Sequence, residues 1–223
     1  MKGFFKLKNL LSIILMPIIF FTMFAGCGKE DSPEEAFSEM QTALTERNFE
    51  KLSQRVDIEK FFAQTYDDVT VELVKNCAEY GKKYPDDPYF QHDAEFLQKY
   101  NADHRDLHLK FLTGIKDAYF SKIPEPEIPE ENPHAYVANE FEKILQSSTA
   151  VVKETKIEKN HATMTVEMQG DNSVRGTFIG NLIFKLEFEK DQTGKWHFKK
   201  IKNLDELTPE LVDKAEVIWV TFF

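Results

Sequence analysis

Two histidines four residues apart are the strongest candidate for chemistry in this sequence. His104 and His108 belong to the charged run 103–108. If the run is helical, both imidazoles lie on one face and could share a zinc ion, with His92 as a further ligand. A zinc protease would need glutamate directly after the first histidine, and Arg105 stands there instead. The alternative is a solvated or hydrogen-bonded pair at the polar end of a core-facing helix. We favour it and predict no metal and no cofactor.

Other catalytic signatures are absent from the sequence. His134, His161 and His197 are isolated from one another in the sequence. No glycine-rich loop ends in Gly-Lys-Ser/Thr, and no serine or cysteine stands at a recognisable spacing from a base. The chain holds 38 acidic residues, so carboxylate pairs are too common to single one out. We therefore predict no catalytic residue.

The chain has only two cysteines, Cys27 and Cys77. Cys77 falls on an apolar stripe with helical spacing, which predicts a small buried side chain rather than a reactive thiol. The stripe consists of Phe62, Tyr66, Val69, Leu73, Cys77 and Tyr80.

The first 26 residues have the organisation of a secretion signal. Three lysines and no acid precede an apolar run from Leu10 to Phe24, and Ala25-Gly26 then supply small residues at a cut site. The apolar run holds about fifteen residues and includes Pro17, whereas a membrane-spanning helix needs about 20. Residues 1–26 are thus predicted to be a cleaved signal peptide.

The segment Phe24-Ala25-Gly26-Cys27 resembles the lipobox of bacterial lipoproteins. The resemblance implies that Cys27 is acylated and becomes the mature N-terminus, with 27–31 as a short tether. It also implies export and a lipid anchor in the cell membrane or outer membrane, facing outside the cytoplasm. A plain signal peptide cut after Gly26, leaving a free thiol, is the alternative.

Removal of the signal leaves 197 residues, enough for one domain with a sizeable core. The signal carries three of the 28 basic residues and none of the 38 acids, so the mature charge is −13. Such a charge repels nucleic acid and anionic lipid headgroups, which argues against both as partners. We therefore expect no nucleic-acid partner.

Residues 32–147 are predicted to be helical. Ser32-Pro33-Glu34-Glu35 is typical of a helix start, and Asp57 can cap a second helix that runs to Gly81. Separate segments around Phe90–Leu97 and Phe111–Tyr119 follow. The four prolines of 123–133 predict an extended acidic connector before one more helix.

Residues 149–203 change to strand periodicity. Two strands are predicted on either side of a turn at Lys159-Asn160, a third over Phe178–Glu189, and a fourth around Trp196 and Phe198. Short turns between them predict an antiparallel meander with one solvated face. In the C-terminal segment 204–223, we expect a short helix over Leu207–Ala215 and a strand over Val217–Phe223.

This α+β order, helices and then a curved antiparallel sheet, resembles the NTF2-like or cystatin-like cone with an enlarged helical region. The similarity rests on Ser32-Pro33-Glu34-Glu35-Ala36-Phe37, on Arg47-Asn48-Phe49-Glu50-Lys51-Leu52, and on Gly194-Lys195-Trp196-His197-Phe198 up to Ile201. The family has no common catalytic residue, so the resemblance implies a fold for 32–223 but no reaction.

Twenty phenylalanines add a last indication. They predict either a filled core or, in a cone, an apolar pocket, and we favour the filled core. The expected function is a membrane-anchored, non-catalytic binding or scaffolding domain of unknown partner, which could be a protein or a small apolar ligand. The alternatives are a carrier of a small apolar ligand and an enzyme that uses a pocket in the cone.

Overall fold

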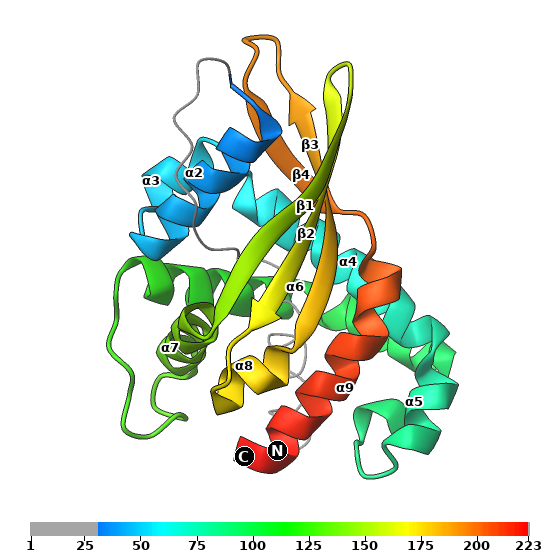
Figure 1. The fold of residues 1–223 in the computed structure, drawn as a ribbon. Helices are drawn as coiled ribbons and strands as arrows, with labels where there is room; N and C mark the ends of the chain where they lie inside the picture. The colour runs from blue at the N-terminus through cyan, green and yellow to red at the C-terminus, as the bar shows by residue number, and fades with distance from the viewer. Residues whose placement is uncertain (1–30, 223) are drawn as a thin grey trace.

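The computed structural model describes residues 31–222, with the side chains of all but Phe178 and 217–222. The predicted signal peptide, Cys27 and most of the predicted tether lie outside the described residues. The element order is α+β, with helices first and a four-stranded sheet after them (Figure 1). Among the described residues no helix is long and apolar enough to cross a bilayer.

The first helices begin where capping side chains predict. In α2 (Pro33–Thr45) the hydroxyl of Ser32 accepts from the Glu35 backbone N–H at 3.1 Å. In α4 (Ile58–Lys75) the carboxylate of Asp57 does the same for Lys60. The short α3 (Phe49–Ser53) lies between them. Each cap satisfies a backbone donor that has no partner within the helix.

The second helix does not run to Gly81 as expected. It ends at Lys75, and α5 (Cys77–Lys83) begins after a break at Asn76. The Asn76 side-chain amide donates to the Glu72 carbonyl at 2.9 Å, so the side chain competes with the backbone for the end of the helix.

The prediction of two separate helical segments, around Phe90–Leu97 and Phe111–Tyr119, was wrong. A short turn, η2 (Tyr89–Gln91), precedes one 27-residue helix, α6 (Ala94–Phe120). The middle of this helix has few apolar residues, but it buries Asn101 and His108. Buried polar residues therefore stand where helical spacing would call for apolar ones. The proline-rich connector then leads to α7 (Pro133–Gln146).

The sheet is the predicted antiparallel meander, in the order β1-β2-β3-β4. Its strands are β1 (Ser148–Glu158), β2 (His161–Gly170), β3 (Asn181–Lys190) and β4 (Trp196–Ile201). Between β2 and β3 the short helix α8 (Val174–Ile179) was not expected, and the third strand therefore begins at Asn181 rather than Phe178. The Ser173 hydroxyl caps α8, and Gly180 leaves it with φ +58°.

The C-terminal prediction was also wrong. A single helix, α9, spans Leu204–Phe222 in place of a short helix and a strand. Its first half is buried through Leu207, Leu211, Val212 and Ala215. Once these turns are fixed by packing, extending the helix costs less than starting a new strand, although the last residues favour a strand by composition.

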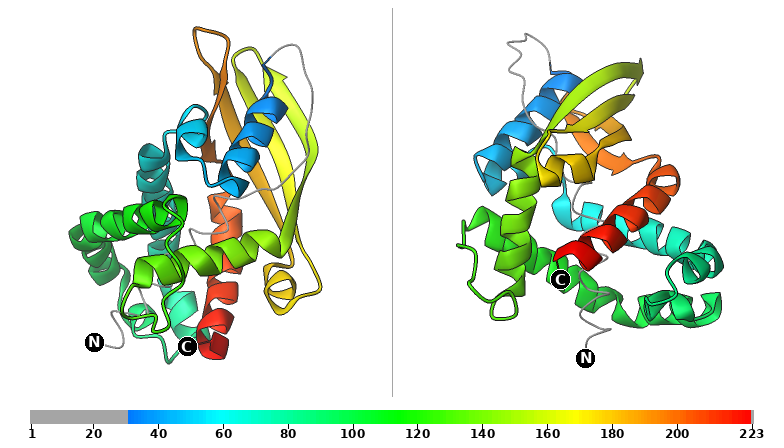
Figure 2. Two further views of the ribbon diagram at one scale, coloured as in Figure 1. Left: turned by 90° about the vertical axis from the view of Figure 1, so that its left-hand side faces the viewer. Right: turned by 60° about the horizontal axis from the view of Figure 1, so that its bottom comes forward.

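One face of the sheet forms the core with the helices. Met164, Val166, Phe184 and Phe188 are each fully buried, whereas Ile183 on the opposite face is 51% exposed. The long helices lie below the sheet and to one side of it (Figure 2). Alternation of buried and exposed residues along β2 and β3 confirms the predicted solvated face.

The two outer strands of the sheet differ. The Phe198 N–H of β4 donates to the Arg55 carbonyl at 2.8 Å, so this edge is covered by the chain after α3. At the other edge, β1 exposes Val151, Val152 and Ile157 and has a register shift between Val152 and Glu154.

Candidate functional site

Five rings follow one another at intervals of four residues, the first just before α6 and the other four on that helix. We call this set, His92, Phe96, Tyr100, His104 and His108, the ring ladder. Successive ring centroids are 3.9, 6.1, 4.1 and 6.2 Å apart, and each pair is close to parallel. The ladder runs from an exposed ring at His92 to a buried one at His108. The spacing is visible in the sequence, but its two aromatic members do not stand out among so many.

The ladder places the rings of His104 and His108 next to each other, with their centroids 6.2 Å apart. One imidazole nitrogen of His104 lies 2.9 Å from the Tyr100 carbonyl, and Nδ1 of His108 lies 2.9 Å from the Tyr66 hydroxyl. Within residues 31–222 no group of three potential ligand side chains surrounds any point. The geometry fits the hydrogen-bonded pair better than a shared zinc ion.

A buried polar network connects the ladder to α4. The Tyr66 hydroxyl donates toward the Asn101 carbonyl at 3.0 Å, and the Asn101 amide pairs with the Tyr89 hydroxyl at 2.9 Å. Burial raises the pKa values of Tyr66 and Tyr89 above their ordinary range, so both hydroxyls remain protonated donors. The network joins α4 to α6 through buried polar groups.

Next to this network, α4 and α6 leave an open groove of about 400 Å³ between them. Its walls are mostly apolar and come from both helices: Tyr66, Val71 and Val74 of α4 and Asn101, Ala102 and Arg105 of α6. Val71 is 63% exposed at the rim. This α4–α6 groove is the candidate binding surface.

An ion pair closes one end of the α4–α6 groove. Nε and Nη2 of Arg105 lie 2.7 and 2.8 Å from the two carboxylate oxygens of Asp67, a fork-to-fork pair from one helix to the other. The hydrogen bond to Asp67 raises the pKa of Arg105. The exposed pair adds little stability, but it defines where the apolar surface ends.

A second cluster lies where the chain enters the domain. The Arg55 side chain is only 6% exposed. Its Nη2 donates a hydrogen bond to Asp31 and its Nε donates one to Glu39, both at 2.6 Å. Its Nη1 donates to the Trp196 carbonyl at 3.1 Å. Asp31 also accepts from the Trp196 backbone N–H at 2.5 Å. We call these four residues the entry clamp, because they hold the start of the domain to β4.

Charge in the entry clamp is balanced by hydrogen bonds. Burial alone would raise the pKa of Asp31, but the bonds from Arg55 and from the Trp196 N–H lower it overall. Burial alone would lower the pKa of Arg55, and its two carboxylate partners raise it instead. Sequence reasoning assigned Asp31 to the tether and gave Arg55 no role, because nothing in the local pattern links residues 24 positions apart.

The clamp predicts a loss of stability in acid. Asp31 has a lowered pKa in the folded state. Its contribution to the folding stability is therefore fully present above the ordinary pKa of 3.8, and it is lost as the pH falls through the lower pKa of the folded state. We expect Asp31→Asn to be about 1 kcal/mol less stable than wild type at neutral pH. Urea unfolding at neutral pH and below pH 3.8 should show the two proteins converging in acid. A constant difference would contradict the assignment.

Buried tyrosines predict a limit at high pH. Burial raises the pKa of Tyr80 and of Tyr119 to about 12, from an ordinary value of 10.0. Between these values the unfolded chain loses protons that the folded chain keeps, so stability falls as the pH rises above 10. As the pH is raised, the tyrosinate absorbance of the folded protein should increase at a higher pH than that of the denatured protein, and it should then rise sharply as the protein unfolds. Coincident curves would contradict this prediction.

The other residues considered from the sequence have ordinary environments. Cys77 is buried at 6% exposure, as predicted. His197 lies 2.9 Å from Asp191 at the surface, beside the buried Trp196. The His134 ring packs on Phe111 and comes so close to Gly114 that a Cβ there would lie 2.6 Å from it.

No protein-family model, no curated protein and no solved structure matches this chain.

Proposed function

We propose that the chain is an exported lipoprotein, acylated on Cys27, whose domain binds or scaffolds a protein partner without catalysis. The observation that carries this proposal is the entry clamp. Asp31 is fastened to Arg55 and Trp196, so only residues 28–30 separate Cys27 from a fixed point of the domain. Several acyl chains give the stable membrane attachment that one chain does not.

We further propose that the domain is an NTF2-like or cystatin-like cone with added helices. In support, α2 begins at the expected Ser32 cap, and the meander closes with β4, which carries Trp196 and Ile201. The long α6 and the proline-rich connector are the enlargement. The cell membrane or the outer membrane would carry the protein; Gly28 is not the aspartate that retains lipoproteins at an inner membrane.

Metabolic labelling tests the anchor. Wild-type protein should incorporate a radioactive fatty acid and remain with the membrane fraction, whereas Cys27→Ala should do neither. Cys77→Ala is the matched control, because it removes the other cysteine and should label normally. Equal labelling of wild type and Cys27→Ala would overturn the proposal.

Site-specific crosslinking tests the binding role. A photoreactive residue at Val71, in the α4–α6 groove, should give a discrete adduct in cells. The same residue at Val174, which is 68% exposed on α8, should not. Substitution Ala102→Glu in the groove should remove the adduct. Equal crosslinking at both positions would contradict a dedicated surface.

A small-ligand carrier is the second candidate, favoured by the volume of the groove. About 400 Å³ lies within the range of ligand pockets, and most of its lining is apolar. A carrier would enhance the fluorescence of an apolar dye and lose this with Val71→Glu, with no adduct in the crosslinking experiment.

A further inference from the structure

Both hairpin turns lie together at one end of the sheet. The Lys190 N–H of the β3–β4 hairpin donates to the Asn160 carbonyl of the β1–β2 turn at 2.7 Å. We call residues 153–161 and 187–200 the hairpin end. It is the upper end of the sheet in Figure 1.

The entry clamp places the tether at this same end. Asp31 bonds to Trp196, which pairs with Lys190 directly after the β3–β4 turn. From Asp31 to Cys27 are four residue steps, which span at most about 14 Å. A lipid on Cys27 therefore holds the hairpin end close to the bilayer, and no long linker lets the domain turn over.

The charge of the hairpin end differs from that of the remaining chain. It carries seven lysines and five acids, a net charge of +2, which leaves −15 on the rest of the mature protein. Anionic lipid attracts basic residues within about a Debye length of 8–10 Å, and it repels acids there. The net negative charge of the whole domain disfavours contact with an anionic membrane, but the net positive charge of the hairpin end favours it.

An exposed apolar side chain accompanies the lysines. Ile157 is 54% exposed beside the β1–β2 turn, with Lys156 before it and Glu158 and Lys159 after it. Apolar and basic groups together are the combination that binds at the headgroup level of a bilayer. Lys190 lies over the Trp196 ring, 5.8 Å from its centroid, and so is held at the same end.

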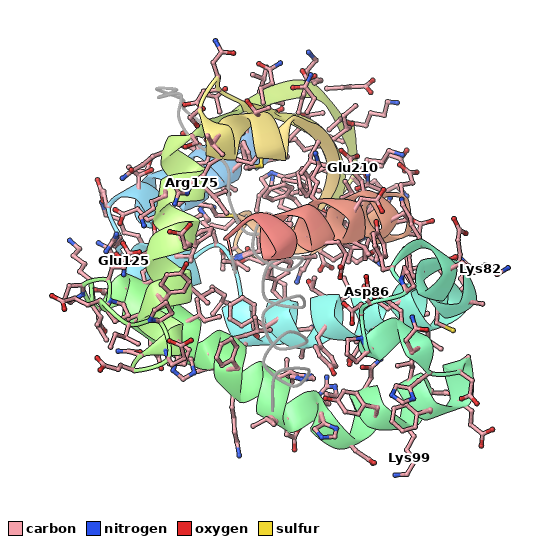
Figure 3. The ribbon with its side chains drawn as sticks, turned by 90° about the horizontal axis from the view of Figure 1, so that it is seen from below. Lys82, Asp86, Lys99, Glu125, Arg175 and Glu210 are labelled. Atoms are coloured by element: carbon pink, nitrogen blue, oxygen red, sulfur yellow. The ribbon has the colours of Figure 1, made fainter. Side chains whose placement is uncertain are left out.

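We propose that the hairpin end docks on an anionic bilayer surface, with Lys159, Lys195 and Ile157 at the headgroups. This inference rests on the proposed acylation of Cys27. Docking leaves α5 and the adjoining part of the α4–α6 groove at the opposite end, free to meet a partner. Figure 3 shows that opposite end, including Lys82 and Asp86.

Collisional quenching in vesicles tests the docking. Full-length lipidated protein is reconstituted in vesicles of phosphatidylcholine and phosphatidylglycerol with a headgroup quencher. A fluorophore is attached to Gln192→Cys at the hairpin end or to Lys82→Cys on α5. Buried Cys77 should take no label, and the parent protein checks this. Quenching at residue 192 should exceed that at residue 82 several-fold.

Charge reversal separates docking from simple tethering. Lys159→Glu with Lys195→Glu should remove most of the excess quenching at residue 192, as should vesicles of phosphatidylcholine alone. Lys99→Glu with Lys110→Glu, on α6, is the matched control and should change nothing; unfolding midpoints check that each variant folds.

The outcomes distinguish the two proposals. If wild type does not sediment with vesicles of phosphatidylcholine alone, or Cys27→Ala sediments with them equally, the anchor is overturned, and so is the docking that rests on it. If wild type alone sediments but both labels are quenched equally, or charge reversal has no effect, the docking alone is overturned.

Discussion

Replacing Arg55 by methionine is expected to lower the free energy of unfolding by about 3 kcal/mol. Methionine keeps much of the side-chain volume but leaves the Asp31 carboxylate and the Trp196 carbonyl without their partner. Losing one member of a buried ion pair costs far more than the pair contributes, because the other charge stays desolvated. Half-exposed Glu39 can return to water, so the expected loss is at the lower end of the usual range.

Denaturant unfolding of matched variants measures this effect. Arg105→Met removes the fork-to-fork pair with Asp67, but that pair is exposed, so the expected loss is below about 1 kcal/mol. A double variant, Asp31→Asn with Arg55→Met, should recover part of the stability lost by Arg55→Met alone. Equal losses in the two arginine variants would show that the entry clamp is not a buried interaction.

Replacing Phe188 by alanine is expected to cost about 4 kcal/mol. The ring is fully buried on the inner face of β3, and it packs edge-to-face on Phe198 of β4 with centroids 5.7 Å apart. The substitution removes apolar burial and leaves a cavity that the surrounding strands close only in part.

The control for this prediction lies on the same strand. Ile183 is 51% exposed on the opposite face, and Ile183→Ala should cost below about 1 kcal/mol. Thermal and denaturant unfolding of both variants gives the comparison. A small loss for Phe188→Ala would mean that the inner face of the sheet borders a space, as in a ligand carrier, and would contradict a filled core.

The sequence predicts those parts of the fold that depend on neighbouring residues. Ser32 and Asp57 begin helices, and Lys159-Asn160 makes the turn, because caps and tight turns are local interactions. The alternation along β2 and β3 predicts the meander because each strand buries one face.

The errors occur where distant contacts decide the outcome. The middle of α6 is helical through buried polar groups such as Asn101 and His108, whose partners Tyr89 and Tyr66 belong to other elements. The C-terminal residues are helical because the preceding half of α9 is already packed. Composition alone shows neither effect.

The candidate site was predicted in part. His104 and His108 were recognised as a pair, but the hydrogen bond between His108 and Tyr66 joins residues 42 positions apart. The α4–α6 groove exists only through the packing of two helices, and the entry clamp through a bond from Asp31 to Trp196, 165 positions away. Spacing rules cannot reveal such contacts.

The unequal outer strands of the sheet have a consequence for misassembly. At β4 the backbone is already engaged by the chain after α3, so no further strand can join there without displacing Arg55. At β1 an irregular register and charges such as Lys153, Glu154 and Lys156 oppose a joining strand, beside exposed valines. Any fibrous by-product of expression should therefore grow from β1, and substitutions that neutralise those three charges should increase it.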